Sequence, residues 1–214
     1  SVLKQPGTRA WYKVKEGIGY IDLEKIKHNE LKKAFAELKD AKGIIIDLRN
    51  YPDFADDIAD YLYPEKKQIV KLQEPQHPGE LIYDAKAELR VFGDPFKAGG
   101  SNKDYYKGQV VLLVDRTTAS HAEWVGMKIQ MAPNCITIGE QTAGAVMNRN
   151  TVLLADNTTV DYTYAAAFYP DGTPAHGKGL RIDAPVIENA VNFNPDLYIE
   201  EAVKIIDKAP ILSR

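Results

Sequence analysis

The chain has 214 residues, of which 44% are hydrophobic and 27% charged, a balance that is ordinary for a globular protein with a sizeable core. The net charge of −3 gives no basic footprint for nucleic acid, and no apolar run approaches the roughly 18 residues of a membrane-spanning helix. The single cysteine, Cys135, excludes an internal disulfide, and we expect it to be a small buried apolar residue. We therefore expect one domain with no nucleic-acid partner and no membrane segment.

The first part of the chain predicts strands and helices in alternation. Apolar runs bounded by turn residues indicate strands, whereas apolar residues that repeat every three or four positions indicate helices. The expected elements are an edge strand or hairpin over residues 11–21, a helix over residues 23–38, a buried strand over residues 44–46 and a short helix over residues 55–63. Asp47 and Arg49 directly follow the buried strand, and we expect them to pair there in a structural role.

The least regular part of the chain is residues 64–101. Strands are expected over residues 69–72 and 80–92, with a turn cluster at residues 75–80 between them. A loop follows over residues 93–104. An irregular segment of this kind can form the wall of a cleft or a plain surface loop, and the sequence does not favour one of these two roles over the other.

Residues 108–144 show the clearest organisation. The apolar run 110–114 predicts a strand, residues 120–131 predict a helix, and residues 136–138 predict a second strand. Ser120 lies at the predicted start of the helix, beside unpaired N–H groups and the positive end of the helix dipole. Such donors can stabilise an oxyanion when a serine attacks an acyl group. The alternative is that Ser120 only caps the helix.

The remaining elements complete an α/β pattern. They are a hairpin formed by residues 151–154 and 158–164 around Asp156-Asn157, a strand over residues 165–169, and a closing helix over residues 194–206 that begins with Pro195. The order of strands and helices, with parallel crossovers between the central strands, predicts an α/β fold.

Three stretches resemble the C-terminal processing (tail-specific) peptidases and the tricorn core, a family of serine peptidases. TTASHAEW and IGEQTAG resemble the nucleophile helix and the turn after it, and Ser120, Glu123, Gly139, Thr142 and Gly144 match position by position. GIIIDLRNYP resembles the family's strand that ends in Asp-Leu-Arg-x-Asn-x-Gly-Gly. YPDGTPAHGKGLRIDAPV is similar to a third family segment. The matches occur in family order and cover roughly residues 17–208.

The resemblance implies a catalytic core with the layered β-β-α spiral of the ClpP/crotonase type. It implies a single peptidase core domain over residues 1–214, without a PDZ-like segment and belonging to a longer protein with upstream PDZ-like and helical domains. The implied partner is a polypeptide substrate, and no cofactor is implied. The histidines and acids lack zinc-type spacings, so no metal site is expected. The protein is extracytoplasmic (periplasm or cell envelope) if a signal peptide has been removed and cytoplasmic otherwise.

The resemblance also assigns roles. Ser120 is the nucleophile, with Thr142 and Gly144 in the adjoining turn. The backbone N–H of His121 and N–H groups near Asp53-Phe54 are expected to hold the oxyanion. The family has a Gly-Gly pair where this chain has Asp53-Phe54, and this departure weakens that half of the assignment.

The catalytic base is the least defined role. Aligned on the turn, the family's catalytic lysine corresponds to Ala145 and its assisting glutamine to Arg149, so the chain cannot run a serine–lysine dyad. The tricorn-like branch takes a histidine from upstream of the core. Of the histidines present, we expect His28 to be solvated, His77 to lie in a turn cluster and His121 to point away from its neighbour. His176, in a loop of the third segment, is the internal candidate for the base.

Two functions are compatible with these features. The first is a serine endopeptidase core that uses Ser120, with His176 or a group outside the chain as base. The second is a non-catalytic domain of the same fold that binds a peptide or small ligand. Retention of Ser120 favours the first, and the loss of the lysine and glycines favours the second.

Overall fold

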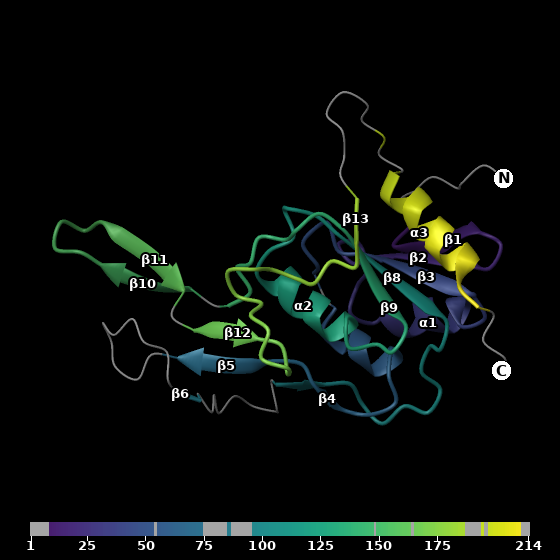
Figure 1. Ribbon diagram of the computed structural model, residues 1–214, viewed down its shortest axis with the longest axis horizontal. Coiled ribbons are helices and arrows are strands. Elements are labelled where there is room, and N and C mark those ends of the chain that lie inside the picture. Colours follow the sequence, from purple (N-terminus) through teal and green to yellow (C-terminus); the bar gives the residue numbers. More distant parts are fainter. Residues whose placement is uncertain are drawn as a thin grey trace.

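In the computed structural model, six strands form a central sheet that carries the rest of the chain (Figure 1). The structure describes residues 9–53, 55–74, 85–86, 96–147, 149–163, 165–186, 194 and 197–210. In spatial order the strands are β1 (Trp11–Lys15), β2 (Ile18–Asp22), β3 (Gly43–Asp47), β8 (Gln109–Val114), β9 (Cys135–Gly139) and β13 (Ala184–Pro185). Only β1 is antiparallel to its neighbour, and the other pairs are parallel. The predicted α/β class is confirmed.

Helices cover both faces of this sheet. Side chains alternate along each strand, so Ile44 and Ile46 face one side while Ile45 faces the other. Helices α1 (Leu31–Leu38) and α2 (His121–Ile129) and the 3₁₀ helix η1 (Asp56–Tyr61) pack on the first side. Of the helices that the structure describes, only α3 (Leu197–Lys208) packs on the second side (Figure 1). The near-continuous apolar sequence of β3 and β8 follows from this two-sided burial.

Short strands extend the molecule beyond the central sheet. β5 (Lys71–Glu74) pairs with β12 (Ala166–Phe168) and β6 (Ala85–Lys86), and β4 (Lys67–Gln68) pairs with β7 (Lys97–Ala98). The hairpin predicted around Asp156-Asn157 is present as β10 (Arg149–Leu153) and β11 (Thr159–Thr163). Asn157 adopts a positive φ of 65° in its turn, a conformation that asparagine tolerates.

The helix predicted over residues 23–38 begins only at Leu31. The Asp22 carboxylate accepts the backbone N–H of Glu24 at 3.0 Å, and the Glu30 carboxylate accepts that of Lys27 at 3.0 Å. The second bond takes the Lys27 N–H that the predicted helix would donate to the Leu23 carbonyl, and residues 23–25 and 28–30 form turns instead. Periodicity alone does not register such competition.

Other boundaries also differ from expectation. The strand predicted over residues 69–72 overlaps only the start of β5, because the buried Ile69 and Val70 lie between β4 and β5 and belong to neither strand. Most of the strand predicted over residues 80–92 lies outside the described residues, as do Phe54, His77 and Pro195. The described part of the closing helix starts at Leu197.

Candidate active site

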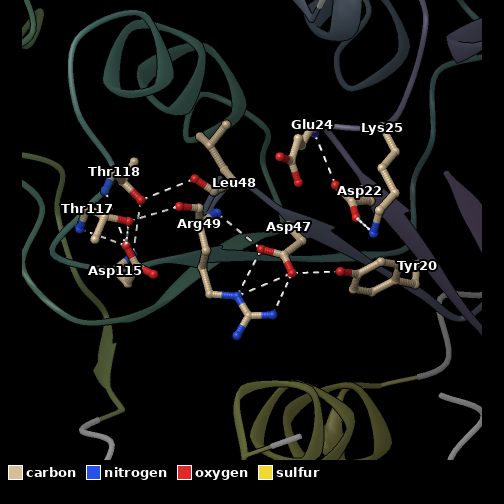
Figure 2. A network of polar contacts seen from close by, with 10 residues as sticks. All are labelled: Tyr20, Asp22, Glu24, Lys25, Asp47, Leu48, Arg49, Asp115, Thr117 and Thr118. Atoms are coloured by element: carbon tan, nitrogen blue, oxygen red, sulfur yellow. Dashed lines mark hydrogen bonds and ion pairs between the residues drawn. The ribbon is translucent and has the colours of Figure 1, made fainter. Parts of the chain in front are cut away.

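The site is built at the carboxyl ends of β3 and β8, beginning with a partly buried ion pair. Asp47 ends β3, and its carboxylate accepts the Tyr20 hydroxyl at 2.6 Å and the Arg49 guanidinium at 2.6 Å (Figure 2). Burial and then the charge of Asp47 raise the pKa of Tyr20, so its hydroxyl remains a donor. Burial lowers the pKa of Arg49, but the hydrogen bond and charge of Asp47 outweigh it and the net pKa is raised. The expected structural role of this pair is confirmed.

The loops that follow the two strands are bonded to each other. The Thr118 hydroxyl donates to the Leu48 carbonyl at 3.1 Å, and that of Thr117 donates to the Arg49 carbonyl at 3.2 Å (Figure 2). The Asp115 carboxylate accepts the Thr117 backbone N–H at 2.8 Å and so fixes the turn that leads into α2. The chain therefore enters α2 from a loop tied to the end of β3.

Ser120 occupies the N-cap of α2 in an unusual backbone conformation. Its φ is 56° and its ψ is −122°, which places it outside both the helical and the extended regions. The residue is exposed, whereas the next turn of the helix is buried. A non-glycine residue with positive φ costs roughly 1–3 kcal/mol and persists only where its surroundings impose it.

The buried carboxylate of Glu123 holds the start of α2 against the following turn. One oxygen accepts the backbone N–H of Ser120 at 3.2 Å and that of Ala145 at 2.7 Å. The other accepts the Thr142 hydroxyl at 2.6 Å and the Gly144 N–H at 2.7 Å. Because Ser120 and Ala145 donate to the same atom, the helix start and the turn are neighbours. Glu123 thus has a larger structural role than favourable charge at a helix N-terminus.

Two glycines of the turn are required by close backbone contacts. A Cβ at Gly139 would lie 1.8 Å from the Val114 carbonyl oxygen, and its φ is +133°. A Cβ at Gly144, where φ is +73°, would lie 2.9 Å from the Lys178 nitrogen. The third matching segment reaches the same turn, since the Gly177 N–H donates to the Gly144 carbonyl at 2.7 Å and the Leu180 N–H donates to the Thr142 hydroxyl oxygen at 2.8 Å. All three matching stretches therefore meet around Ser120.

The side chain of His121 points toward the loop after β3. Its Nε2 lies 3.6 Å from an Asp56 carboxylate oxygen, and its ring centroid lies 6.2 Å from that of the exposed Tyr51. The other Asp56 oxygen is 2.5 Å from the Nζ of Lys128, two turns further along α2. Asp53 is exposed within this loop. The segment that follows β3, which includes Tyr51 and Asp56, thus lies beside the start of α2.

Sequence reasoning did not single out Asp56 or Lys128. Lys128 is a charged residue that is buried, and its neighbours on the helix are apolar. The available signal was its spacing, because residues seven apart on a helix share a face and His121 and Lys128 can therefore reach one acidic partner.

His176 lies beside the turn, next to Gly177. Its backbone N–H donates to the Ala167 carbonyl at 3.0 Å, while its buried Nδ1 has no hydrogen-bond partner among the described residues. His28 is exposed and lies 3.7 Å from Asp57. No hydrogen bond joins an imidazole to Ser120 within the part of the chain that the structure describes.

Burial raises the pKa of the Cys135 thiol to about 12, so it stays protonated at neutral pH, and the residue packs against the core. The described residues include no cluster of three or more His, Cys, Asp or Glu side chains arranged to bind a metal ion. Within the same residues, no helix has both the length and the apolar character needed to cross a bilayer.

The chain matches the model of peptidase family S41 over residues 17–186. It is 27% identical over 197 residues to a probable CtpA-like serine protease from Staphylococcus epidermidis, covering 86% of this chain and 37% of that protein. A relative of the same name from Staphylococcus aureus is 28% identical over 188 residues, covering 82% of this chain and 34% of that protein. The chain thus spans about a third of the length of these relatives.

Solved structures share the fold. A candidate peptidase from Parabacteroides merdae superposes with a TM-score of 0.76 at 17% identity, covering 94% of this chain and 66% of that one. The photosystem II D1 C-terminal processing protease superposes with a TM-score of 0.56 at 22% identity, covering 92% and 48%. The resemblance to the C-terminal processing peptidases is confirmed, and the chain belongs to peptidase family S41.

Proposed function

We propose that the chain is the catalytic core of a serine endopeptidase of the C-terminal processing type, with Ser120 as nucleophile. The observation that carries this proposal is the placement of Ser120, exposed at the start of α2 and joined through Glu123 to the turn of Thr142, Gly144 and Ala145. Its strained backbone supports the assignment, since such conformations cluster at functional sites.

The proposed reaction proceeds in two stages. The Ser120 oxygen bonds to the peptide carbonyl carbon, its proton passes to the base, and the resulting oxyanion forms a tetrahedral intermediate. The C–N bond then breaks and the base returns the proton to the leaving amine, which leaves an ester on Ser120. Water hydrolyses this ester in a second addition and elimination, which frees the serine.

Backbone donors would stabilise the oxyanion. The N–H of His121 is the first of α2, where helical N–H groups lack a partner within the helix and the dipole is positive. We assign the second donor to the loop of Asp53 and Phe54, because His121 contacts Asp56 of the same segment. Removing one donor of this kind typically costs 10²–10³ in rate, so both halves matter.

The base is proposed to come from outside this chain, with His176 as the internal candidate. Ala145 stands where the resembled branch has its lysine, and it has no titratable group. His176 adjoins Gly144 through Gly177, and its free Nδ1 is compatible with a partner that the described residues do not supply.

We further propose the finer architecture that the family resemblance implies. The mostly parallel sheet with helices on both faces is compatible with the layered ClpP/crotonase spiral, in one core domain over residues 1–214. The substrate would be an unfolded or tagged polypeptide cut near an exposed end. Upstream PDZ-like and helical domains would belong to the parent protein, which agrees with the greater length of the relatives.

The test compares the 214-residue chain and a longer parent form, each beside its Ser120→Ala variant, on an unfolded protein substrate. We expect cleavage by the longer form, loss of cleavage in Ser120→Ala, and little or no cleavage by the short chain. General-base assistance is worth roughly 10²–10⁴ in rate, so its absence suppresses turnover and leaves binding intact.

Two results would change this assignment. Cleavage by the short chain that His176→Ala abolishes would place the base inside it. Cleavage that persists without Ser120, or its absence in every form, would contradict the nucleophile assignment and leave a binding domain of the same fold.

A further inference from the structure

A cavity of about 610 Å³ opens between the start of β1, the segment that precedes α1, and α1 itself. Its volume falls within the range of roughly 300–1,000 Å³ that is typical of small-molecule sites. The charged side chains that line it are those of Arg9, Lys25, Lys27, Lys33, Glu30 and Glu37. None of these residues belongs to the candidate active site around Ser120.

Hydrogen bonds join the walls of this cavity. Trp11 of β1 donates its indole N–H to the Glu37 carboxylate of α1 at 2.9 Å. The Ala10 carbonyl accepts the backbone N–H of Asp22 at 2.8 Å, at the start of the segment that leads to α1. The walls are therefore fixed relative to one another, and a ligand does not have to order them.

The cavity also adjoins the edge of the sheet at which α/β proteins usually bind ligands. β1 runs antiparallel to β2, and Trp11 at its start lies opposite Ile21 near the end of β2. The start of β1 is therefore at the carboxyl end of β2, next to the carboxyl end of β3. Ligands of open α/β sheets bind outside the carboxyl ends of the strands.

The cavity is positively charged, although the chain as a whole has a net charge of −3. Four of the charged side chains that line it are cationic and two are acidic. Asp22 pairs with Lys25 at 2.6 Å (Figure 2), which leaves an excess of one positive charge. An acidic protein thus has a cationic cavity on its surface.

Three of the cations have no anionic partner among the described residues. Both carboxylates of the lining accept hydrogen bonds from neutral donors. The side chains of Arg9 and Lys27 form no hydrogen bond or ion pair within the same residues, and the Lys33 ammonium lies only over the Trp11 ring, 5.7 Å from its centroid. Cations that line one cavity without partners repel one another, and an anion bound between them relieves this repulsion.

We infer that the cavity binds a small molecule that carries two or more phosphate or carboxylate groups. Lysine ammonium groups bind either kind of group as point charges, and the guanidinium of Arg9 can bind one with two parallel hydrogen bonds. The cavity is larger than one such group requires, and Trp11 and Ala10 supply apolar surface for the carbon atoms of the ligand. This inference does not depend on the function proposed for Ser120.

Tryptophan fluorescence of the 214-residue chain can report binding, because Trp11 lines the cavity. The probes are tripolyphosphate and citrate, with glycerol as the uncharged control. All are added at constant ionic strength, so that general screening does not imitate binding. Trp11→Phe should abolish the fluorescence change, since the other tryptophan, Trp124, lies in α2 and does not line the cavity.

The test variant is Lys27→Gln/Lys33→Gln, which removes two of the cations without a partner. Both residues are exposed and glutamine is a good helix former, so the fold should be retained. The matched control is Lys32→Gln/Lys39→Gln, which removes the same charge from exposed positions in α1 and directly after it that do not line the cavity. Lys27→Gln alone is the alternative if the test variant does not fold.

At least one of the two anionic probes should bind saturably, and glycerol should not. The test variant should weaken this binding roughly tenfold or more, while the control should remain within about twofold of the parent. A response to tripolyphosphate alone would identify the ligand groups as phosphates, and a response to citrate alone would identify them as carboxylates.

Three results would overturn the inference. They are the absence of a saturable response to either probe at millimolar concentration, an equal loss in the control variant, and a signal that survives Trp11→Phe. Binding of a polyglutamate peptide by a chain that binds neither small anion would also overturn it, and would assign the cavity to an acidic polypeptide.

Discussion

The ammonium of Lys128 lies 2.5 Å from the carboxylate of Asp56, and this contact joins the last turn of α2 to the segment that follows Asp53. The lysine side chain is 9% exposed and the aspartate side chain is 59% exposed. The lysine is therefore held in place by packing, while the aspartate remains hydrated. Through Asp56 the pair also reaches His121, directly after Ser120.

Lys128→Met should reduce turnover more than stability. Methionine fills a similar volume, and the hydrated Asp56 tolerates the loss of its partner, so the free energy of unfolding should change by about 1 kcal/mol or less. The loop to which we assign the second oxyanion donor loses its anchor, so kcat of the cleaving form should fall roughly tenfold with KM little changed. Asp56→Asn should lower kcat similarly but destabilise the fold more, because it leaves the buried Lys128 without its charge partner, and the double variant should add little to the fall in kcat. Additive losses would contradict this coupling.

Glu123→Gln should destabilise the fold. The carboxylate accepts four donors, and an amide would oppose its own NH₂ group to two of them. We expect a loss of about 3 kcal/mol in urea denaturation, which corresponds to ~6–12 °C in Tm for a chain of this size. Glu140→Gln in the same turn is the control, since the Glu140 side chain has no hydrogen bond within the described residues. Equal stability of the two variants would show that the four bonds contribute nothing net.

If the base comes from outside the chain, as proposed, Ala145→Lys should supply one within it. The Ala145 and Ser120 N–H groups donate to one oxygen, so a lysine at this turn starts close to the serine. If the amine is desolvated enough to lose its proton, cleavage by the short chain should rise roughly 10²-fold and increase with pH. Ala145→Met controls for side-chain length. Equal rates in both variants would show that the side chain at this position does not reach Ser120.

The titration of Asp171 should be displaced to acid pH. Hydrogen bonds from the Thr173 backbone and from Arg181 lower the pKa of this carboxyl from 3.8 to about 2. Because the folded pKa is depressed, the stabilisation is complete above pH 3.8 and is lost as the pH falls toward 2. An NMR titration of the Asp171 carboxyl carbon should give this midpoint, and Arg181→Gln should raise it. A midpoint near 3.8 in the unmodified chain would refute the pairing in solution.

The central strands were predictable from sequence because burial on both faces leaves an unbroken apolar run, as in residues 110–114 and 44–46. The start of α2 was predictable because its periodicity begins at Ser120. The start of α1 was not, since the Glu30 carboxylate captures the Lys27 N–H that a helix would otherwise use.

The matched motif residues were identified from family resemblance, but their physical reasons emerge only in three dimensions. The need for glycine at position 139 comes from the carbonyl of Val114, on a strand 25 residues earlier. The cluster of Lys128, Asp56 and His121 joins two segments whose proximity no local pattern encodes. Contacts of this kind depend on the order of strands in the sheet, which the sequence only constrains.

The backbone of Ser120 places protein stability and reactivity in opposition. At φ 56° and ψ −122° the backbone of any residue with a Cβ is strained, whereas glycine adopts this conformation without strain. Ser120→Gly should therefore melt at a higher temperature than the parent, whereas Ser120→Ala should keep the strain. Under the proposed function, this strain is the cost in stability of presenting the Ser120 hydroxyl. Among proteins with this core, those that no longer hydrolyse peptides should more often have glycine at this position. Those with glycine should also unfold at a higher temperature.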